Sequence, residues 1–393
     1  MNAPSLRAAV DATLGAAVDA GRVPGVIATV ADAAGPLYAG AFGVRALGAP
    51  EPMTLDTVCW IASMTKPLTA AAAMQLVERG VLALDAPAQR WAPPLASIEV
   101  LDGFDDAGEP RTRPPKRPIT LRDLLTHTAG FGYAIWDEAT AQYQRKRELP
   151  GVGSGRLIAL QTVLRFDPGE RWMYGINIDW VGRIVELATG ERLGVYLERN
   201  LLDPLGMNDT AFRLTPALRE RLAKVHQRDA AGALQATDWQ VVQDTEFDLG
   251  GGGLYSTAGD YLRFVRMMLN RGELDGERVL APETADALTR SHTGAIRVTR
   301  LPSTMPEVSN PLEIFPDVPK GWGLSAMVNL EPVPTGRAAG GLMWGGLPNT
   351  YFWIDPARGI GGVYLTQLMP FLDVESLPLY CAFEKAVYDS LGR

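Results

Sequence analysis

Cysteine, histidine and long hydrophobic runs are scarce in this chain of 393 residues. The two cysteines, Cys59 and Cys381, stand far apart, so no disulfide framework is expected and a reducing compartment fits. The three histidines, His127, His226 and His292, show no paired metal-ligand spacing. No apolar run approaches the roughly 18 residues that a membrane-spanning helix requires. We therefore expect no metal, no other cofactor and no membrane span.

Positive charge is also in short supply, with 37 Lys and Arg residues against 45 Asp and Glu residues and a formal net charge of −8. Nucleic acids and anionic membranes both need a positive surface, so neither is an expected partner. Residues 1–25 contain no apolar block followed by a cleavage site, which favours an amphipathic first helix over an export signal. These features predict a soluble cytoplasmic protein.

The pattern of elements predicts an α/β (α+β) fold. Two strands follow the first helix, and several short β-rich runs precede a helix over 374–390 near the other end. The middle of the chain is mostly helical, interrupted by Pro/Gly loops. We predict an α/β domain from residues 1–80 and 311–393, an inserted mostly helical domain over 81–310, and an active site between them. The expected strands are 26–31, 36–44, 323–330, 340–344, 350–355 and 361–368, and the clearest middle helices are 121–127, 179–190 and 258–272.

Ser63 and Lys66 are the first candidates for chemistry. Pro67 belongs in a first helical turn and so predicts a helix that begins near Ser63 and runs to Arg79. Residues three apart share a helix face, so the two side chains can touch. A lysine in a buried first turn opposes the helix dipole and loses solvation, and both effects lower its pKa. Alternatively, Ser63 caps the helix and Lys66 extends into solvent. The S-x-x-K spacing alone fits both the catalytic and the capping interpretation.

Four segments resemble the serine β-lactamase/penicillin-binding protein superfamily, within it the class C-like group that includes family VIII carboxylesterases. They are CWIASMTKPLTAAAAMQLVERGVLALDAP (59–87), ITLRDLLTHTAGFGY (119–133), GERWMYGINIDWVGRIVELATG (169–190) with PLGMNDT (204–210), and LGGGGLYSTAGDYLRFVRMMLNRGELDGERVL (249–280). With the C-terminal strands they span nearly the whole chain. The resemblance implies a β-lactamase-like fold, in which an antiparallel sheet is flanked by the N- and C-terminal helices.

The resemblance also implies a proton relay. Ser63 is the nucleophile, Lys66 lies beside it, and Tyr174 matches the tyrosine of the second motif. The backbone N–H groups of Ser63 and Leu347 would form the oxyanion hole. The class C pattern has an asparagine two residues after the tyrosine, where this chain has Ile176, and this departure puts amide recognition of a substrate carbonyl in doubt.

The third motif is matched by Trp344, Gly345 and Gly346. Tryptophan stands where β-lactamases have a cation, as in many family VIII esterases, and we expect it to form an apolar wall of the substrate site. A core tryptophan is the alternative. Tyr133 and Asp179, which lies five residues after Tyr174 as in those esterases, are the other expected substrate-binding residues.

Other residues in these segments are weaker candidates. In the resembled family the histidine of the DLLTHTAG segment is structural, and this chain has no G-x-S-x-G elbow, so we expect His127 to be structural and not catalytic. Four more aromatic residues lie in or beside matched segments, where each can line an acyl pocket or simply pack in the core: Trp136, Trp180, Tyr255 and Tyr351.

These observations predict a serine carboxylesterase that hydrolyses short- to medium-chain esters through an acyl-enzyme on Ser63. A β-lactamase, a D,D-peptidase, another amide hydrolase or an acyltransferase would use the same machinery. The apparent lack of an export signal weighs against the first two, whose substrates lie outside the cytoplasm. A non-catalytic binding protein on this fold is the least expected alternative, because Ser63, Lys66 and Tyr174 are all present.

Overall fold

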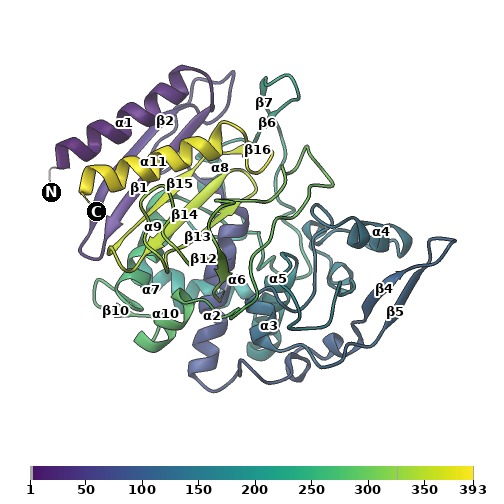
Figure 1. The fold of residues 1–393 in the computed structure, drawn as a ribbon. Coiled ribbons are helices and arrows are strands. Elements are labelled where there is room, and N and C mark those ends of the chain that lie inside the picture. Colours follow the sequence, from purple (N-terminus) through teal and green to yellow (C-terminus); the bar gives the residue numbers. More distant parts are fainter. Residues whose placement is uncertain (1–2, 325, 393) are drawn as a thin grey trace.

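The main sheet of the molecule is antiparallel and is built from both ends of the chain (Figure 1). The computed structural model describes residues 3–324 and 326–392. In the described part the sheet has seven strands in the order β11-β12-β13-β14-β15-β1-β2. Strand β1, from the start of the chain, therefore pairs with β15, from its end, and β2 forms the edge. The strands are β1 (Gly25–Asp32), β2 (Pro36–Gly43), β11 (Lys320–Trp322), β12 (Met327–Asn329), β13 (Leu342–Gly346), β14 (Thr350–Asp355) and β15 (Ile360–Leu365).

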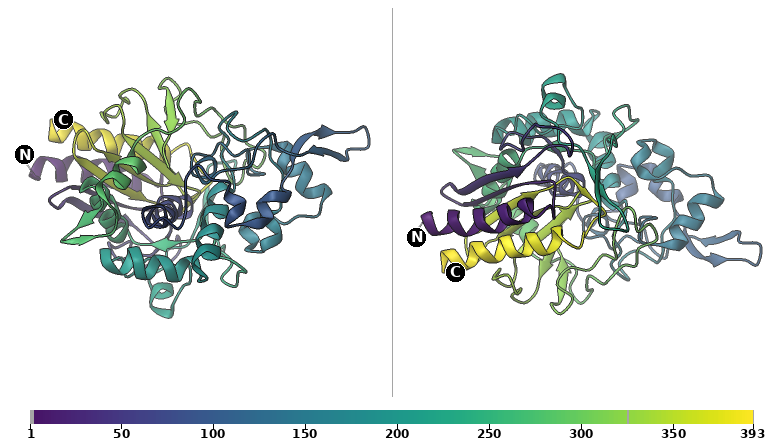
Figure 2. Two further views of the ribbon diagram at one scale, coloured as in Figure 1. Left: turned by 90° about the horizontal axis from the view of Figure 1, so that it is seen from below. Right: turned by 90° about the horizontal axis from the view of Figure 1, so that it is seen from above.

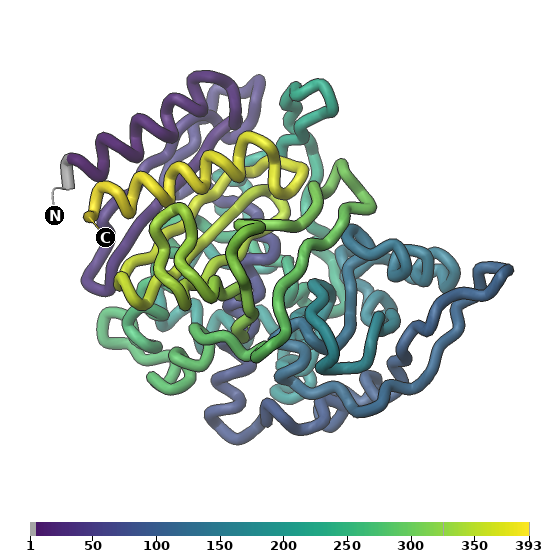
Figure 3. Tube along the Cα trace, viewed as in Figure 1, coloured from purple at the N-terminus to yellow at the C-terminus, as the bar shows by residue number. Residues whose placement is uncertain are grey.

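Helices cover both faces of the sheet. Neighbouring residues of a strand point to opposite faces, and β14 shows which helix lies on each. Phe352 packs against Tyr261 of α9 (Ala258–Leu269), with ring centroids 5.3 Å apart. Trp353 packs against Phe383 of α11 (Ser376–Leu391) at 5.4 Å. The first helix, α1 (Ala3–Asp19), lies beside α11, so the two ends of the described part of the chain come close together (Figure 3).

Helix α2 (Thr65–Glu78) runs through the interior of the molecule. Nearly all of its residues are buried, as expected for an Ala-rich helix that is almost free of charge. It begins just after a 3₁₀ turn over Ala62–Met64 and packs against α5 (Asn177–Thr189). The predicted helix over residues 63–79 is therefore present, with Ser63 in the tight turn that precedes the regular helix.

The rest of the chain forms short helices and small sheets, joined by long loops. The hairpin of β4 (Val100–Phe104) and β5 (Pro110–Arg113) extends away from the body in every view (Figures 1 and 2). The other helices are α3 (Leu121–Leu125), α4 (Glu138–Lys146), α6 (Leu193–Leu197), α7 (Asp203–Leu205), α8 (Pro216–Glu220) and α10 (Pro282–Thr289). The remaining strands are β3 (Cys59–Trp60), β6 (His226–Arg228), β7 (Leu234–Ala236), β8 (Tyr255–Ser256), β9 (Glu273–Leu274), β10 (Glu277–Arg278) and β16 (Leu368–Met369).

Most of the helices and strands that the sequence predicted begin and end within a few residues of the observed ones. One difference is the strand expected over 323–330, which overlaps only β12, because the chain turns between β11 and β12 and they pair as a hairpin. The division into domains at residues 80 and 310 stays a prediction. Within the described residues, no helix is long and apolar enough to cross a membrane.

Candidate active site

Ser63 stands on a strained turn at the beginning of α2. The residue before it, Ala62, has φ of 44°, a left-handed conformation that costs a non-glycine residue roughly 1–3 kcal/mol. Strand β13 presses against this turn. A Cβ atom on Gly346 would lie 2.3 Å from the carbonyl oxygen of Ile61 and 3.0 Å from Cβ of Ala62. Glycine at position 346 therefore lets the sheet approach the turn that presents Ser63.

Lys66 is fully buried and lies beside Ser63. Its Nζ is 3.1 Å from Ser63 Oγ, 3.2 Å from the hydroxyl of Tyr133 and 2.6 Å from the carbonyl oxygen of Gly251. Burial lowers the pKa of Lys66 to about 7, against the opposing charge of Asp179. A neutral amine has two hydrogens and a lone pair, so Lys66 can donate to Gly251 and Tyr133 while it accepts the Ser63 proton.

Tyr174 completes the cluster from the segment before α5. Its hydroxyl hydrogen-bonds to Ser63 and accepts the indole N–H of Trp344 at 2.8 Å. Lys66 Nζ lies 4.7 Å from the centroid of its ring. Burial raises the pKa of Tyr174, so its hydroxyl keeps its proton at neutral pH. The structure thus brings together the three residues of the predicted relay, and their catalytic roles stay a prediction.

Trp344 lies deeper than the sequence suggested. We expected it to form a wall of the substrate site, but its side chain is fully buried behind Tyr174 and is not among the residues that line the cavity beside Ser63. Its ring packs on Trp322 of β11, with centroids 4.6 Å apart. Gly345 and Gly346 are buried with it in β13. The position of Trp344 therefore suits it to orient Tyr174.

Asp179 and Tyr133 surround Lys66 on its other side. Asp179, in the first turn of α5, accepts the N–H of Gly251 at 2.9 Å and lies 3.4 Å from the Tyr133 hydroxyl. Burial raises the pKa of Asp179, and the charge of Lys66 opposes that shift. The pKa of Tyr133 is raised well above its usual value, mainly by burial. Both residues line the cavity, and both are in position to influence the charge of Lys66.

His127 packs behind Tyr174. The two rings lie 4.7 Å apart, and the Asn177 amide lies 2.8 Å from His127 Nδ1. Burial lowers the pKa of His127 well below its usual value, so the ring is neutral. No hydrogen bond joins it to Ser63 in the described residues. This arrangement suits the structural role expected from the sequence.

A cavity of about 390 Å³ opens beside Ser63 and has mostly apolar walls. Ile176 and Leu347 line it near the catalytic cluster, and Trp60 and Trp239, whose tilted rings have centroids 4.2 Å apart, form another part of the wall. Trp136 lines it too, whereas Trp180, Tyr255 and Tyr351 are buried outside it. Its other walls come from Ala62, Gly132, Ala134, Ile135, Gln144, Gly151, Val152, Gly153, Gln240, Val241, Val242, Leu249, Gly252 and Val308.

Sequence reasoning missed two parts of this site. The carbonyl of Gly251 is the closest hydrogen-bond partner of Lys66. A Cβ atom on Gly251 would lie 2.4 Å from Asp179 Oδ2, so the glycine run at 250–253 was the available signal of a close backbone approach. Trp60 and Trp239 are 179 residues apart in the chain, and no local pattern indicates that their rings are in contact.

Comparison with known proteins identifies the family. The family model described as Beta-lactamase matches residues 10–378. The chain belongs to this family. A methylbutanoyltransferase from Aspergillus terreus named for monacolin J acid is 33% identical over 95% of this chain and 93% of its own length. A lovastatin esterase from Penicillium rubens is 35% identical, covering 91% of this chain and 92% of its own. Esterase EstB from Burkholderia gladioli is 33% identical, covering 99% of this chain and 96% of its own length.

Solved structures agree with this assignment. The LovD6 mutant of simvastatin synthase from Aspergillus terreus superposes with a TM-score of 0.85 at 31% identity, covering 98% of this chain and 97% of its own. EstCE1, described as a hydrolase with promiscuous acyltransferase activity, gives a TM-score of 0.75 at 25% identity. The match covers 98% of this chain and 99% of EstCE1. The β-lactamase-like fold predicted from the sequence is therefore confirmed, and the protein is an enzyme of the serine hydrolase and acyltransferase type.

Proposed function

We propose that this protein is a carboxylesterase that hydrolyses short- to medium-chain esters through an acyl-enzyme on Ser63. The observation that carries the proposal is the 3.1 Å contact between Ser63 Oγ and Nζ of the buried Lys66, beside an apolar cavity. A buried amine with a pKa of about 7 can accept the serine proton near neutral pH.

The contacts support a sequence of proton transfers. Lys66 accepts the Ser63 proton while Oγ attacks the ester carbonyl carbon, and the N–H groups of Ser63 and Leu347 stabilise the oxyanion. Tyr174 accepts the N–H of Trp344, which leaves its own proton free to pass to the departing alcohol. Lys66 returns the proton to Tyr174. Water then attacks the acyl-enzyme, and the same groups move the protons in reverse.

The charge of the cavity supports an ester and not a β-lactam as the substrate. No Lys, Arg or His is among its described lining residues, and Asp179 is its one acidic side chain. A carboxylate-bearing penicillin or cephalosporin would find no cation there. Ile176 also supplies no amide where the class C pattern has one.

Relative turnover of esters and β-lactams tests this proposal. Each lost charge-assisted hydrogen bond removes about 1.5–3 kcal/mol, so two losses should lower kcat/KM by about 10²- to 10⁴-fold. We expect this gap between p-nitrophenyl butyrate and both nitrocefin and benzylpenicillin. Comparable kcat/KM values for the two classes would move the protein to the β-lactamases. Ser63→Ala serves as the blank for uncatalysed hydrolysis.

Acyl transfer to an alcohol is the second candidate. Two relatives support it: the methylbutanoyltransferase, which matches nearly the full length of the chain, and EstCE1, whose description names acyltransferase activity. Reaction of vinyl butyrate with increasing butanol separates the two activities. A hydrolase releases mainly butyric acid, whereas an acyltransferase forms mainly butyl butyrate while water is still in excess.

A further inference from the structure

The chain buries two lysines, and the proposed chemistry uses only one of them. All six lysines lie in the described residues, and Lys66 and Lys320 are the buried ones. Lys320, 7% exposed, begins β11 and donates from Nζ to the carbonyl oxygen of Phe315 at 2.7 Å. No carboxylate in the described residues lies within 4.0 Å of this nitrogen. A buried ammonium without a paired anion is costly, so an anionic partner would stabilise it.

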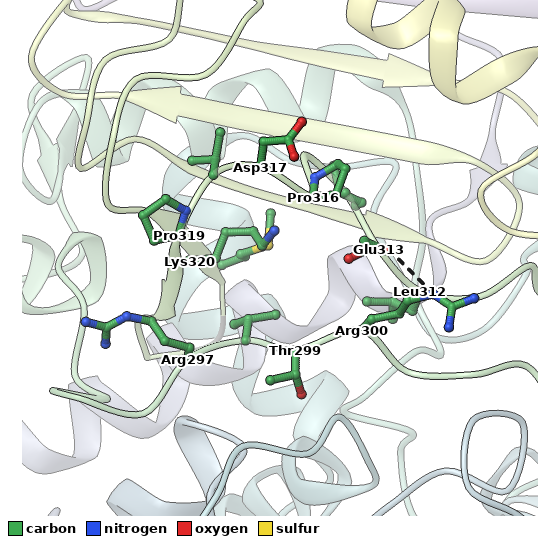
Figure 4. Close-up of a pocket in the computed structure, with 13 residues that line it drawn as sticks. Arg297, Thr299, Arg300, Leu312, Glu313, Pro316, Asp317, Pro319 and Lys320 are labelled. Atoms are coloured by element: carbon green, nitrogen blue, oxygen red, sulfur yellow. Dashed lines mark ion pairs between the residues drawn. The ribbon is translucent and has the colours of Figure 1, made fainter.

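Lys320 points into a second cavity, of about 280 Å³, that shares no lining residue with the one beside Ser63. Figure 4 shows Lys320 at the centre of the ring of residues that line it. Two arginines, Arg297 and Arg300, also line it, and Figure 4 shows their guanidinium groups directed away from Lys320. The apolar part of the lining is formed by Val298, Leu312, Ile314, Val318 and Met327.

Positive charge is in excess in this cavity. Its three cations face two carboxylates, Glu313 and Asp317. Glu313 pairs with Arg300 at 3.5 Å. The guanidinium of Arg297 donates only to backbone oxygens, those of Gly294 at 2.6 Å and Ile296 at 3.4 Å. Glu313 and Asp317 act on Lys320 from beyond ion-pair distance. Among the described residues, one exposed guanidinium and one buried ammonium therefore have no paired carboxylate.

We propose that this cavity binds a small organic anion, whose carboxylate or phosphate group pairs with Lys320 and toward which the exposed side chain of Arg297 turns. Such a group supplies acceptors for the remaining N–H bonds of Lys320 and neutralises its buried charge. The volume limits the ligand to a small metabolite, and the carboxylates of Glu313 and Asp317 favour one that also carries hydroxyl groups as donors. The site is independent of the proposed esterase reaction.

Thermal unfolding of the full chain tests the proposal with citrate and glycerol phosphate as probes at constant ionic strength. A ligand that binds only the folded state raises Tm in a saturable way. We expect saturation with at least one probe, and the stronger response distinguishes carboxylate from phosphate. Lys320→Met keeps the length of the side chain among apolar neighbours and should lose the response. Lys385→Gln, at an exposed lysine of α11, should keep it.

Arg297→Gln provides a second variant at an exposed position, where the fold is not at risk. We expect it to weaken the apparent Kd by about tenfold, the usual value of one charge-assisted hydrogen bond. The proposal is overturned if neither probe gives a saturable shift, or if Lys320→Met and Arg297→Gln respond as the wild type does.

Discussion

The floor of the active site and its rim are built in opposite ways. The floor, which we define as Lys66, Tyr133, Tyr174 and Asp179, is buried, and each side chain has a hydrogen-bond partner within 3.4 Å. In the rim, which we define as Trp60, Trp239 and Val242, the buried Trp60 donates its indole N–H to the carbonyl oxygen of Gly252 and supports Trp239. Trp239 and Val242 are 48% and 44% exposed. The floor is therefore fixed in position, whereas the rim offers surface that a substrate can cover.

The elements that carry the two regions explain this difference. Lys66 and Asp179 stand in the first turns of two packed helices, α2 and α5. Trp239 and Val242 stand in a coil between β7 and β8, which is held at its middle by the hydrogen bond from Val241 N to the hydroxyl of Tyr255. Groups that move protons need fixed geometry, and groups that select substrates tolerate variation on loops. We therefore expect floor substitutions to affect the chemistry and rim substitutions to affect selectivity.

The largest effect is expected for the relay in the floor. Lys66→Ala and Tyr174→Phe should each lower kcat for p-nitrophenyl butyrate on the order of 10³-fold, because each breaks the same path of proton transfer. The double variant should be little worse than either one, since groups that act as a unit are strongly non-additive. Steady-state kinetics of the wild type, the two single variants and the double variant gives the four kcat values for this comparison. Losses that multiply would mean that the two residues act independently.

A smaller effect, on pH dependence, is expected for Asp179. Lys66 must be neutral to accept a proton, so kcat/KM should rise with pH through the Lys66 pKa of about 7 and then level off. The negative charge of Asp179 raises that pKa, so Asp179→Asn should lower it and move the rising limb to lower pH. The dependence of kcat/KM on pH, measured from about pH 5 to about pH 9, records the shift.

The control for this experiment is Glu191→Gln, a change of the same kind at an acidic residue outside the cavity, which should leave the limb in place. A limb that stays in place or moves to higher pH in Asp179→Asn would show that Asp179 does not stabilise the charged form of Lys66.

The smallest effect is expected at the rim. Trp239→Ala removes an aromatic surface that a long acyl chain can cover, worth about 1.4 kcal/mol or about tenfold in kcat/KM. The loss should appear for p-nitrophenyl octanoate and be absent for the acetate. Trp239→Phe should retain most of the preference, and Val374→Ala, at an exposed position away from the cavity, should change neither. An equal loss on both esters would place Trp239 in the catalytic machinery.

The sequence predicted the floor better than the rim for a physical reason. Ser63 and Lys66 are three residues apart, so local helix geometry alone brings them together. Tyr174 lies more than 100 residues away and was found only through its motif. The orientation of Trp344 depends on which face of β13 packs against Tyr174, and the spacing of the motif does not specify that. Trp239 lies in a coil whose position is set by tertiary packing.

Covalent labelling of Ser63 tests the central claim most directly. The intact mass of the wild-type protein after reaction with a fluorophosphonate should increase by one adduct, and peptide mapping should place it on Ser63. Ser63→Ala, with its unfolding transition intact, should gain no adduct, because burial raises the pKa of Tyr133, the other hydroxyl beside Lys66, and keeps that oxygen protonated. An adduct on another residue, or labelling of Ser63→Ala at the wild-type rate, would contradict the account.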